Sequence, residues 1–211
     1  MPSKLFITAT LLLIHTADSN IVAQTRDTSA AQPQTEVTVA SELHSTDDDA
    51  RDQEAFYAAD QVQTVRLQIS DIDQQKMRAA LPKCIYVPAQ LSWNGQTIKQ
   101  VGVRFKGNSS ANPNQKHKRS YLIKFSKYKK EQRFLGLERI SLDNGVQFGS
   151  LFSEPIITDI LRKLGHATHR CNFAKLYVNN QFAGVYVNAE RIDDSFISRH
   201  FPGKTGGLWK N

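Results

Sequence analysis

From Val62 onward, apolar and polar residues alternate in a way that predicts a domain built mostly of β-strands. In the segment VQTVRLQIS, the apolar residues Val65, Leu67 and Ile69 alternate with polar ones, which is typical of a strand buried on one face. Similar patterns occur in the segments CIYVPAQLSW, QTIKQVGVRFKG, SYLIKFSKY, ERISLDN and FAKLYVNNQFAGVYVNAERI. Asn94-Gly95 and Asn179-Asn180 lie between strand-like segments and predict two hairpin turns.

Two segments carry helical signals. Ser70 and Asp73 have the spacing of a helix N-terminal cap, which predicts a short helix in SDIDQQKMRAAL. Ser150–Leu164 predicts the main helix, which has to begin near Pro155. Its apolar positions recur at helical spacing: Ile156, Ile157, Ile160, Leu161 and Leu164. Together these elements predict an α+β fold of mostly antiparallel sheet with one main packed helix.

The first 61 residues differ from the rest of the chain. Residues 1–19 combine Lys4, the apolar run Leu5–Ile14 and a final segment with small residues of the kind found at signal-peptide cleavage sites. This order predicts a secretory signal peptide. Residues 20–61 are rich in Thr, Ser, Gln, Ala and Asp and are predicted to be a disordered acidic linker. No later segment is long and apolar enough to span a membrane, so we expect a secreted or cell-envelope protein without a transmembrane span after signal removal.

Charge is divided unevenly between the two parts. Residues 1–60 contain 3 Lys/Arg and 10 Asp/Glu, whereas residues 61–211 contain 24 Lys/Arg and 10 Asp/Glu, a net charge of +14. Such a basic domain attracts anionic lipids, acidic glycans or nucleotide phosphates, or has only a solvated basic surface. The predicted secretion and the lack of a recognisable nucleic-acid-binding module argue against nucleic acid as a partner.

Cysteine and histidine give little further chemistry. Cys84 and Cys171 are expected in an oxidising compartment, where they either form a disulfide or stay free. The segment GHATHRC contains three residues of the types that bind zinc: His166, His169 and Cys171. The segment is expected, however, to be an irregular link after the main helix. We therefore predict no metal site there.

The stretch VGVRFKGNSS, followed by KRSYLIKF, is the strongest candidate for a binding site. Arg104 and Lys106 alternate with the apolar face of a strand, and the Gly-Asn-Ser-Ser loop that follows can present backbone N–H groups to an anion. Lys116, Lys118, Arg119 and Lys124 add positive charge. The stretch is either a phosphate-binding hairpin or a solvated basic loop.

Several blocks of the sequence together resemble the spore-coat CotH family. They are VGVRFKGNSS…KRSYLIKF, QRFLGLERISLDN, LRKLG, FAKLYVNNQFAGVYVNAERID and GGLWK, and the resemblance runs from about Val62 to Lys210. It implies an atypical protein-kinase-like fold that uses ATP and Mg²⁺ to phosphorylate secreted or surface proteins. It also implies nucleotide-binding roles for residues in the matching blocks: Arg104, Lys106, Lys118, Arg119, Glu190 and Trp209, the last by stacking on adenine.

The sequence departs from the family pattern in two places. Ser153 and Pro155 stand where the family's helix usually has Arg and Lys. The sequence also ends at Asn211, before the family's second lobe, so residues 62–211 are expected to be a truncated N-terminal lobe that is inactive by itself. An alternative function is a noncatalytic basic module that binds acidic glycans or a coat or envelope partner.

Overall fold

The computed structural model describes residues 46–146, 149–203 and 208–209. The predicted signal peptide and the part of the predicted linker before residue 46 lie outside the described residues. Within the described part of the chain, no helix combines the length and the apolar character needed to cross a bilayer.

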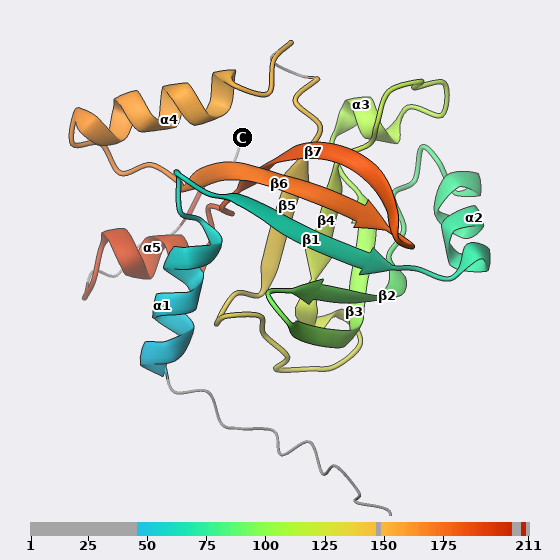
Figure 1. Ribbon diagram of the computed structural model, residues 1–211, viewed down its shortest axis with the longest axis horizontal. Helices are drawn as coiled ribbons and strands as arrows, with labels where there is room; N and C mark the ends of the chain where they lie inside the picture. The colour runs from blue at the N-terminus through green and yellow to red at the C-terminus, as the bar shows by residue number, and fades with distance from the viewer. Residues whose placement is uncertain (1–45, 147–148, 204–207, 210–211) are drawn as a thin grey trace, which may run out of the picture. The chain divides into compact units, whose positions relative to one another are not determined.

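Seven strands form a closed barrel in the order β1–β2–β3–β4–β5–β7–β6 (Figure 1). These are β1 (Val62–Gln68), β2 (Val87–Trp93), β3 (Gln96–Phe105), β4 (Tyr121–Lys124), β5 (Arg139–Asp143), β6 (Cys171–Val178) and β7 (Gln181–Ala189). The described residues also form a 3₁₀ turn and five α-helices: α1 (Thr46–Phe56), α2 (Asp71–Ala79), α3 (Asn108–Ala111), α4 (Ser153–Lys163) and α5 (Asp194–His200). The predicted α+β class is therefore confirmed.

The sheet is mixed, because one of its strand pairs is parallel. β1 pairs in parallel with β6, from Val62 opposite Phe173 to Leu67 opposite Val178, and this pairing closes the barrel. The other neighbouring strands are antiparallel. The alternation within a strand indicates which face is buried but not which strand lies beside it, so the sequence did not predict the parallel closure.

Both predicted hairpin turns are confirmed. Asn94 and Gly95 have φ values of 45° and 78°, and Asn179 and Asn180 have φ values of 49° and 64°. A two-residue turn with positive φ at both positions matches the right-handed twist of the strands that it joins, and Asn and Gly tolerate this conformation best. The turns connect β2 to β3 and β6 to β7.

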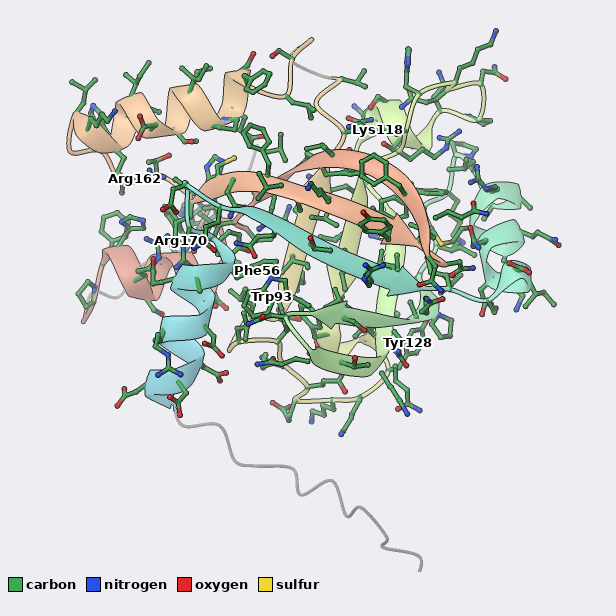
Figure 2. The ribbon with its side chains drawn as sticks, in the orientation of Figure 1. Phe56, Trp93, Lys118, Tyr128, Arg162 and Arg170 are labelled. Carbon is green, nitrogen blue, oxygen red and sulfur yellow. The ribbon has the colours of Figure 1, made fainter. Side chains whose placement is uncertain are left out.

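The folded part begins earlier than the sequence predicted. Residues 46–56, which were assigned to the linker, form α1, and the Phe56 side chain at its end is fully buried. The Phe56 ring makes edge-to-face contacts with Trp93 and Phe134, at centroid distances of 5.4 and 5.2 Å. Figure 2 labels Phe56 and Trp93. Most residues of α1 are polar or acidic, as expected for a helix that is largely exposed. This composition resembles that of a linker, so the sequence did not indicate that Phe56 in the last turn anchors the helix to the core.

The main helix was predicted near its true position, but it is not packed through its apolar face. α4 covers Ser153–Lys163, and Thr158 is its buried residue. Its apolar side chains are exposed by 36–68%: Ile156, Ile157, Ile160, Leu161 and, just after the helix, Leu164. The helical spacing shows that the helix is amphipathic, but it carries no information about what covers the apolar face. α4 contacts β6, so the part of the prediction that was wrong is the expectation that the helix packs through its apolar residues.

Cys84 and Cys171 are both free thiols. The disulfide that the sequence left open is therefore not formed. Burial raises the pKa of the Cys171 thiol, so this first residue of β6 behaves as a small apolar side chain in a cluster with Val187 and Ala189.

We predict that Phe56→Ala lowers the free energy of unfolding by about 3–5 kcal/mol, because it removes a fully buried ring from an aromatic cluster. Urea denaturation of the two proteins measures the difference. Val62→Ala is the control, since Val62 is 53% exposed, and it should change stability far less. A loss below about 1 kcal/mol for Phe56→Ala would show that α1 is not part of the cooperative fold.

Glu138 predicts a specific response of stability to acid. Burial by itself would raise the pKa of Glu138, but hydrogen bonds from Lys124 and Arg139 lower it from the ordinary 4.5 to about 2. The native state therefore binds this proton less readily than the unfolded chain, so the contribution is present above pH 4.5 and is lost as the pH falls toward 2. Glu138→Gln should flatten this part of the pH profile in urea denaturation, whereas parallel profiles for the two proteins would contradict the assignment.

Candidate functional site

Two cavities meet at the end of the barrel where β3 and β5 finish and α4 begins. The first cavity has a volume of about 330 Å³ and the second about 550 Å³. Three side chains line both cavities: Lys106, Asp143 and Glu154. Volumes in this range are typical of small-molecule sites, so the wall that the two cavities share is a candidate ligand-binding surface.

Lys106 is held at the junction of the two cavities. Its Nζ donates hydrogen bonds to Asp143 Oδ1 and Oδ2 at 2.9 and 2.6 Å and to Ser141 Oγ at 2.7 Å. The side chains of Lys106 and Asp143 are 21% and 25% exposed, so the ion pair is accessible from the cavities. The pairing of β3 with β4 and of β4 with β5 brings these residues together across the sheet.

The second cavity is lined by the loop that follows Lys106. Gly107 has a φ of 81°, and a Cβ atom there would meet nothing within 4 Å, so backbone conformation rather than space favours glycine. Asn108 and Ser109 begin the short helix α3 and also line this cavity. Ser120 and Asn144 complete its polar wall, and the Asn144 backbone N–H donates to Ser120 Oγ at 2.9 Å.

The first cavity combines a polar wall with apolar side chains. His169 Nε2 lies 3.1 Å from Glu154 Oε1, which connects the start of α4 to the segment before β6. Ile192, Leu208 and Trp209 add apolar surface, and the Trp209 side chain is 92% exposed. This cavity is therefore suited to a ligand with a flat apolar part.

Glu190 lies in the wall of the first cavity but is engaged by the protein's own arginines. Arg170 donates from its backbone N–H to Glu190 Oε2 at 2.9 Å and from Nη2 to Glu190 Oε1 at 2.6 Å, and Arg199 also donates to Oε2. Arg170, which is labelled in Figure 2, also donates to Glu54 and Gln53 of α1. The 4% exposed Glu190 thus ties α1, β6, β7 and α5 together beneath the cavity.

Arg119 organises the loop between β3 and β4. Arg119 is buried, and its guanidinium donates hydrogen bonds to four backbone carbonyl groups in that loop. The acceptors belong to Ser110, Asn112, Pro113 and Gln115. A carbonyl group buried without a donor is costly, so Arg119 fixes the course of the loop that lines the second cavity.

Two further candidates lie away from Lys106. The Lys118 ammonium donates to the Val185 carbonyl group and lies 4.7 Å from the centre of the Tyr186 ring (Figure 2). Burial lowers the pKa of Lys118. Arg104 donates to the Phe105 carbonyl group at 3.0 Å and lies over the Tyr86 ring. Of the six predicted residues, the structure therefore brings Lys106, Glu190 and Trp209 to one cavity and places Lys118, Arg119 and Arg104 elsewhere.

Sequence reasoning missed polar residues of the cleft that the two cavities form around Lys106. Ser141 and Asp143 are two residues apart on β5, and residues at this spacing in a strand lie on the same face, which is the signal that ISLDN held. Glu154 and His169 gave no such signal, because they approach each other only through the fold. Among the described residues, no group of three or more His, Cys, Asp or Glu side chains could hold a metal ion.

A family model described as CotH kinase protein matches residues 103–210, just over half of the chain. The matched span contains all the residues that line the first and second cavities. The resemblance that the sequence blocks indicated is therefore confirmed over this span. A comparison with curated proteins finds no match.

Arg119→Gln is predicted to lower the free energy of unfolding by about 1–3 kcal/mol, because backbone carbonyl groups in the loop lose their donor. The matched control is Lys116→Gln, which removes an exposed charge from the same loop and should change stability by less than about 0.5 kcal/mol. Urea denaturation measures both effects. Equal stability of the two variants would show that Arg119 does not organise the loop.

Proposed function

Because the chain belongs to the CotH kinase protein family, we propose that the cleft binds ATP as part of a protein that phosphorylates secreted or surface proteins. The predicted signal peptide supports a location outside the cell or in its envelope. The binding step is the part of this function for which the described residues offer a specific arrangement.

The position of Lys106 carries the proposal. Its ammonium group lies where the two cavities meet and is already oriented by Asp143 and Ser141. A phosphate group that entered from the second cavity would meet a fixed cation without first having to order a flexible lysine, so less conformational entropy is lost on binding. Lys106 already donates to three acceptor oxygens, so a phosphate oxygen would replace one of them while the other two keep the ammonium group in place.

The two cavities differ in a way that suits the two ends of a nucleotide. The first cavity offers Ile192, Leu208 and the exposed Trp209 ring, on which a planar base can stack. The second cavity offers the Gly107–Ser109 loop and the side chains of Ser120 and Asn144, which can hydrogen-bond to phosphate oxygens. Lys106 stands between the two, where the first phosphate groups would lie.

The layout also parallels the arrangement that protein kinases use. There, a glycine-containing loop covers the phosphates, a strand supplies a lysine, and a helix supplies its carboxylate partner. Here the loop is the one after β3 and the lysine is Lys106, while the carboxylate partner is Asp143 on β5 rather than a residue of a helix. Glu154 at the start of α4 lines the same cavities, and its carboxylate faces His169 instead.

The described residues do not fit a resident Mg²⁺ ion. The carboxylates of Asp143 and Glu190 are already paired with Lys106, Arg170 and Arg199. Carboxylates that bind Mg²⁺ need free oxygen atoms that converge on the ion. We therefore treat Mg²⁺ as the companion of the bound ATP and derive no step through a protein-held metal.

We predict that ATP added with Mg²⁺ quenches the tryptophan fluorescence of the full chain in a saturable way. The two tryptophans differ sharply, since Trp209 is 92% exposed and Trp93 is 6% exposed, so stacking should affect Trp209. Lys106→Gln should weaken binding by about 10- to 100-fold, because a charge-assisted hydrogen bond contributes roughly 1.5–3 kcal/mol.

Lys124→Gln is the matched control, because Lys124 is also a partly buried lysine paired with a carboxylate, but it lies outside both cavities. It should leave the affinity for ATP unchanged. In a Trp209→Leu variant, binding measured by calorimetry should persist in weakened form while the fluorescence change disappears. Affinity that is the same in the parent and in Lys106→Gln would rule out the proposed cleft.

A further inference from the structure

A third cavity opens at the mouth of the barrel, where β3 ends and β4 begins. This mouth cavity has a volume of about 240 Å³. Its floor consists of three aromatic rings that belong to the barrel core: Phe105, Tyr121 and Tyr186. The ring centres are 5.4 Å apart for Phe105 and Tyr121 and 6.1 Å apart for Tyr121 and Tyr186. Barrel mouths are among the places where ligand sites recur.

The rim of the mouth cavity is strongly basic. Two arginines, two lysines and one histidine line it, and they come from α2 and from the loop before β4: Arg78, Lys116, His117, Lys118 and Arg119. None of the residues that line this cavity is acidic. The rim therefore produces a positive potential over an apolar floor, where charges are screened less than in open water.

Two of these cations are held in fixed positions. Arg119 is buried and is anchored by backbone carbonyl groups, and Lys118 is anchored by the Val185 carbonyl group and the Tyr186 ring. Burial raises the pKa of Tyr121, while Arg78 and Arg119 act in the opposite direction on the same hydroxyl group. Both arginines also line the mouth cavity together with the Tyr121 ring, so both can act on one ligand that lies on it.

The rim cations differ from other cations of the fold in their partners. Lys106, Lys124, Arg170 and Arg199 each pair with a carboxylate. The other ion pairs among the described residues also involve cations outside the rim. Within this part of the chain, therefore, no carboxylate forms an ion pair with Arg78, Lys116, Lys118 or Arg119. Like charges gathered without a counter-ion repel one another, and a bound anion would relieve this repulsion.

We propose that the mouth cavity binds a phosphate monoester, at a site separate from the cleft around Lys106. A phosphate monoester carries up to two negative charges and three acceptor oxygens, so it can use several donors at once, whereas a carboxylate offers one charge and two oxygens. The aromatic floor accommodates the group that carries the phosphate. Lys118 faces Val185 while Lys106 faces Asp143, so the two sites use different cations.

The test is an NMR titration of the full ¹⁵N-labelled chain in chloride buffer. The probes are a phosphoserine peptide and glucose 6-phosphate, each compared with its unphosphorylated form. We expect saturable shifts of the amide signals of residues 115–119 with the phosphorylated probes alone. Tighter binding of the peptide would identify a phosphoprotein as the source of the phosphate, and tighter binding of the sugar phosphate would identify a free metabolite.

Two double variants make the test specific. Arg78→Gln with Lys116→Gln removes two exposed rim charges and should weaken binding at least about tenfold. Lys99→Gln with Lys130→Gln removes two exposed charges elsewhere and should change the affinity less than about twofold. Glucuronate, a sugar that carries a carboxylate in place of the phosphate, is a further control probe. The proposal would be overturned if both double variants weakened phosphate binding equally, if glucuronate bound as tightly as glucose 6-phosphate, or if no probe gave a saturable shift of the amide signals.

The result is independent of the nucleotide proposal. ATP binding in the cleft should shift the amide signals of Lys106 to Ser109, and the Lys106→Gln variant should remove those shifts while leaving the binding of the phosphoserine peptide at residues 115–119 unchanged. A peptide response that disappears together with Lys106 would show a single shared site and would contradict the proposal of a second one.

Discussion

The parallel pairing of β1 with β6 is the constraint on which the arrangement of the fold depends. Without it, β1 and β6 would be two open edges of a curved sheet, each with unpaired backbone N–H and C=O groups. The pairing satisfies these groups and closes the barrel, so that the rings of Phe56, Trp93 and Phe134 can fill one end and those of Phe105, Tyr121 and Tyr186 the other. The turn after β6 reinforces the closure, because the Asn179 side chain exchanges two hydrogen bonds with the backbone of Ile69 just after β1.

The sequence predicted the parts of the fold whose causes are local. The turns at Asn94-Gly95 and Asn179-Asn180 need residues that tolerate positive φ, and the start of α2 needs a side chain such as Ser70 that accepts a hydrogen bond from the Asp73 backbone. The sequence did not predict the partner of β1, the docking of α1 or the exposure of the apolar face of α4. Each of these depends on contacts between distant segments, and α1 in particular is anchored by Phe56 and by the distant Arg170.

The same distinction applies to the candidate site. The position of Lys106 at the end of a strand and before a glycine could be predicted from the sequence, and the structure places it between two cavities. Its partner Asp143 lies 37 residues further along the chain, and only the registers of β3, β4 and β5 bring the two together. Glu190 and Arg119 illustrate the opposite problem, because each lies in a family motif but its hydrogen-bonding groups are engaged by partners within the protein, which the sequence does not show. Arg119 therefore adds positive charge to the mouth cavity rather than free hydrogen-bond donors.

The partners of each charge therefore say more about binding than the net charge of +14 of residues 61–211. Lys124 and Arg139 stabilise the sheet through Glu138, and Arg170 and Arg199 hold Glu190, so these cations have little capacity left for a ligand. Lys106 is paired but remains accessible and oriented, which suits a ligand that shares the cation with Asp143. Arg78 and Lys116 are exposed above the aromatic floor of the mouth cavity, and no carboxylate lines this cavity. Their positive charge is therefore available to an anion from solution. The basic character of the domain thus separates into structural ion pairs, a positioned lysine in the cleft and an uncompensated rim at the barrel mouth, and each responds differently to salt and to anions.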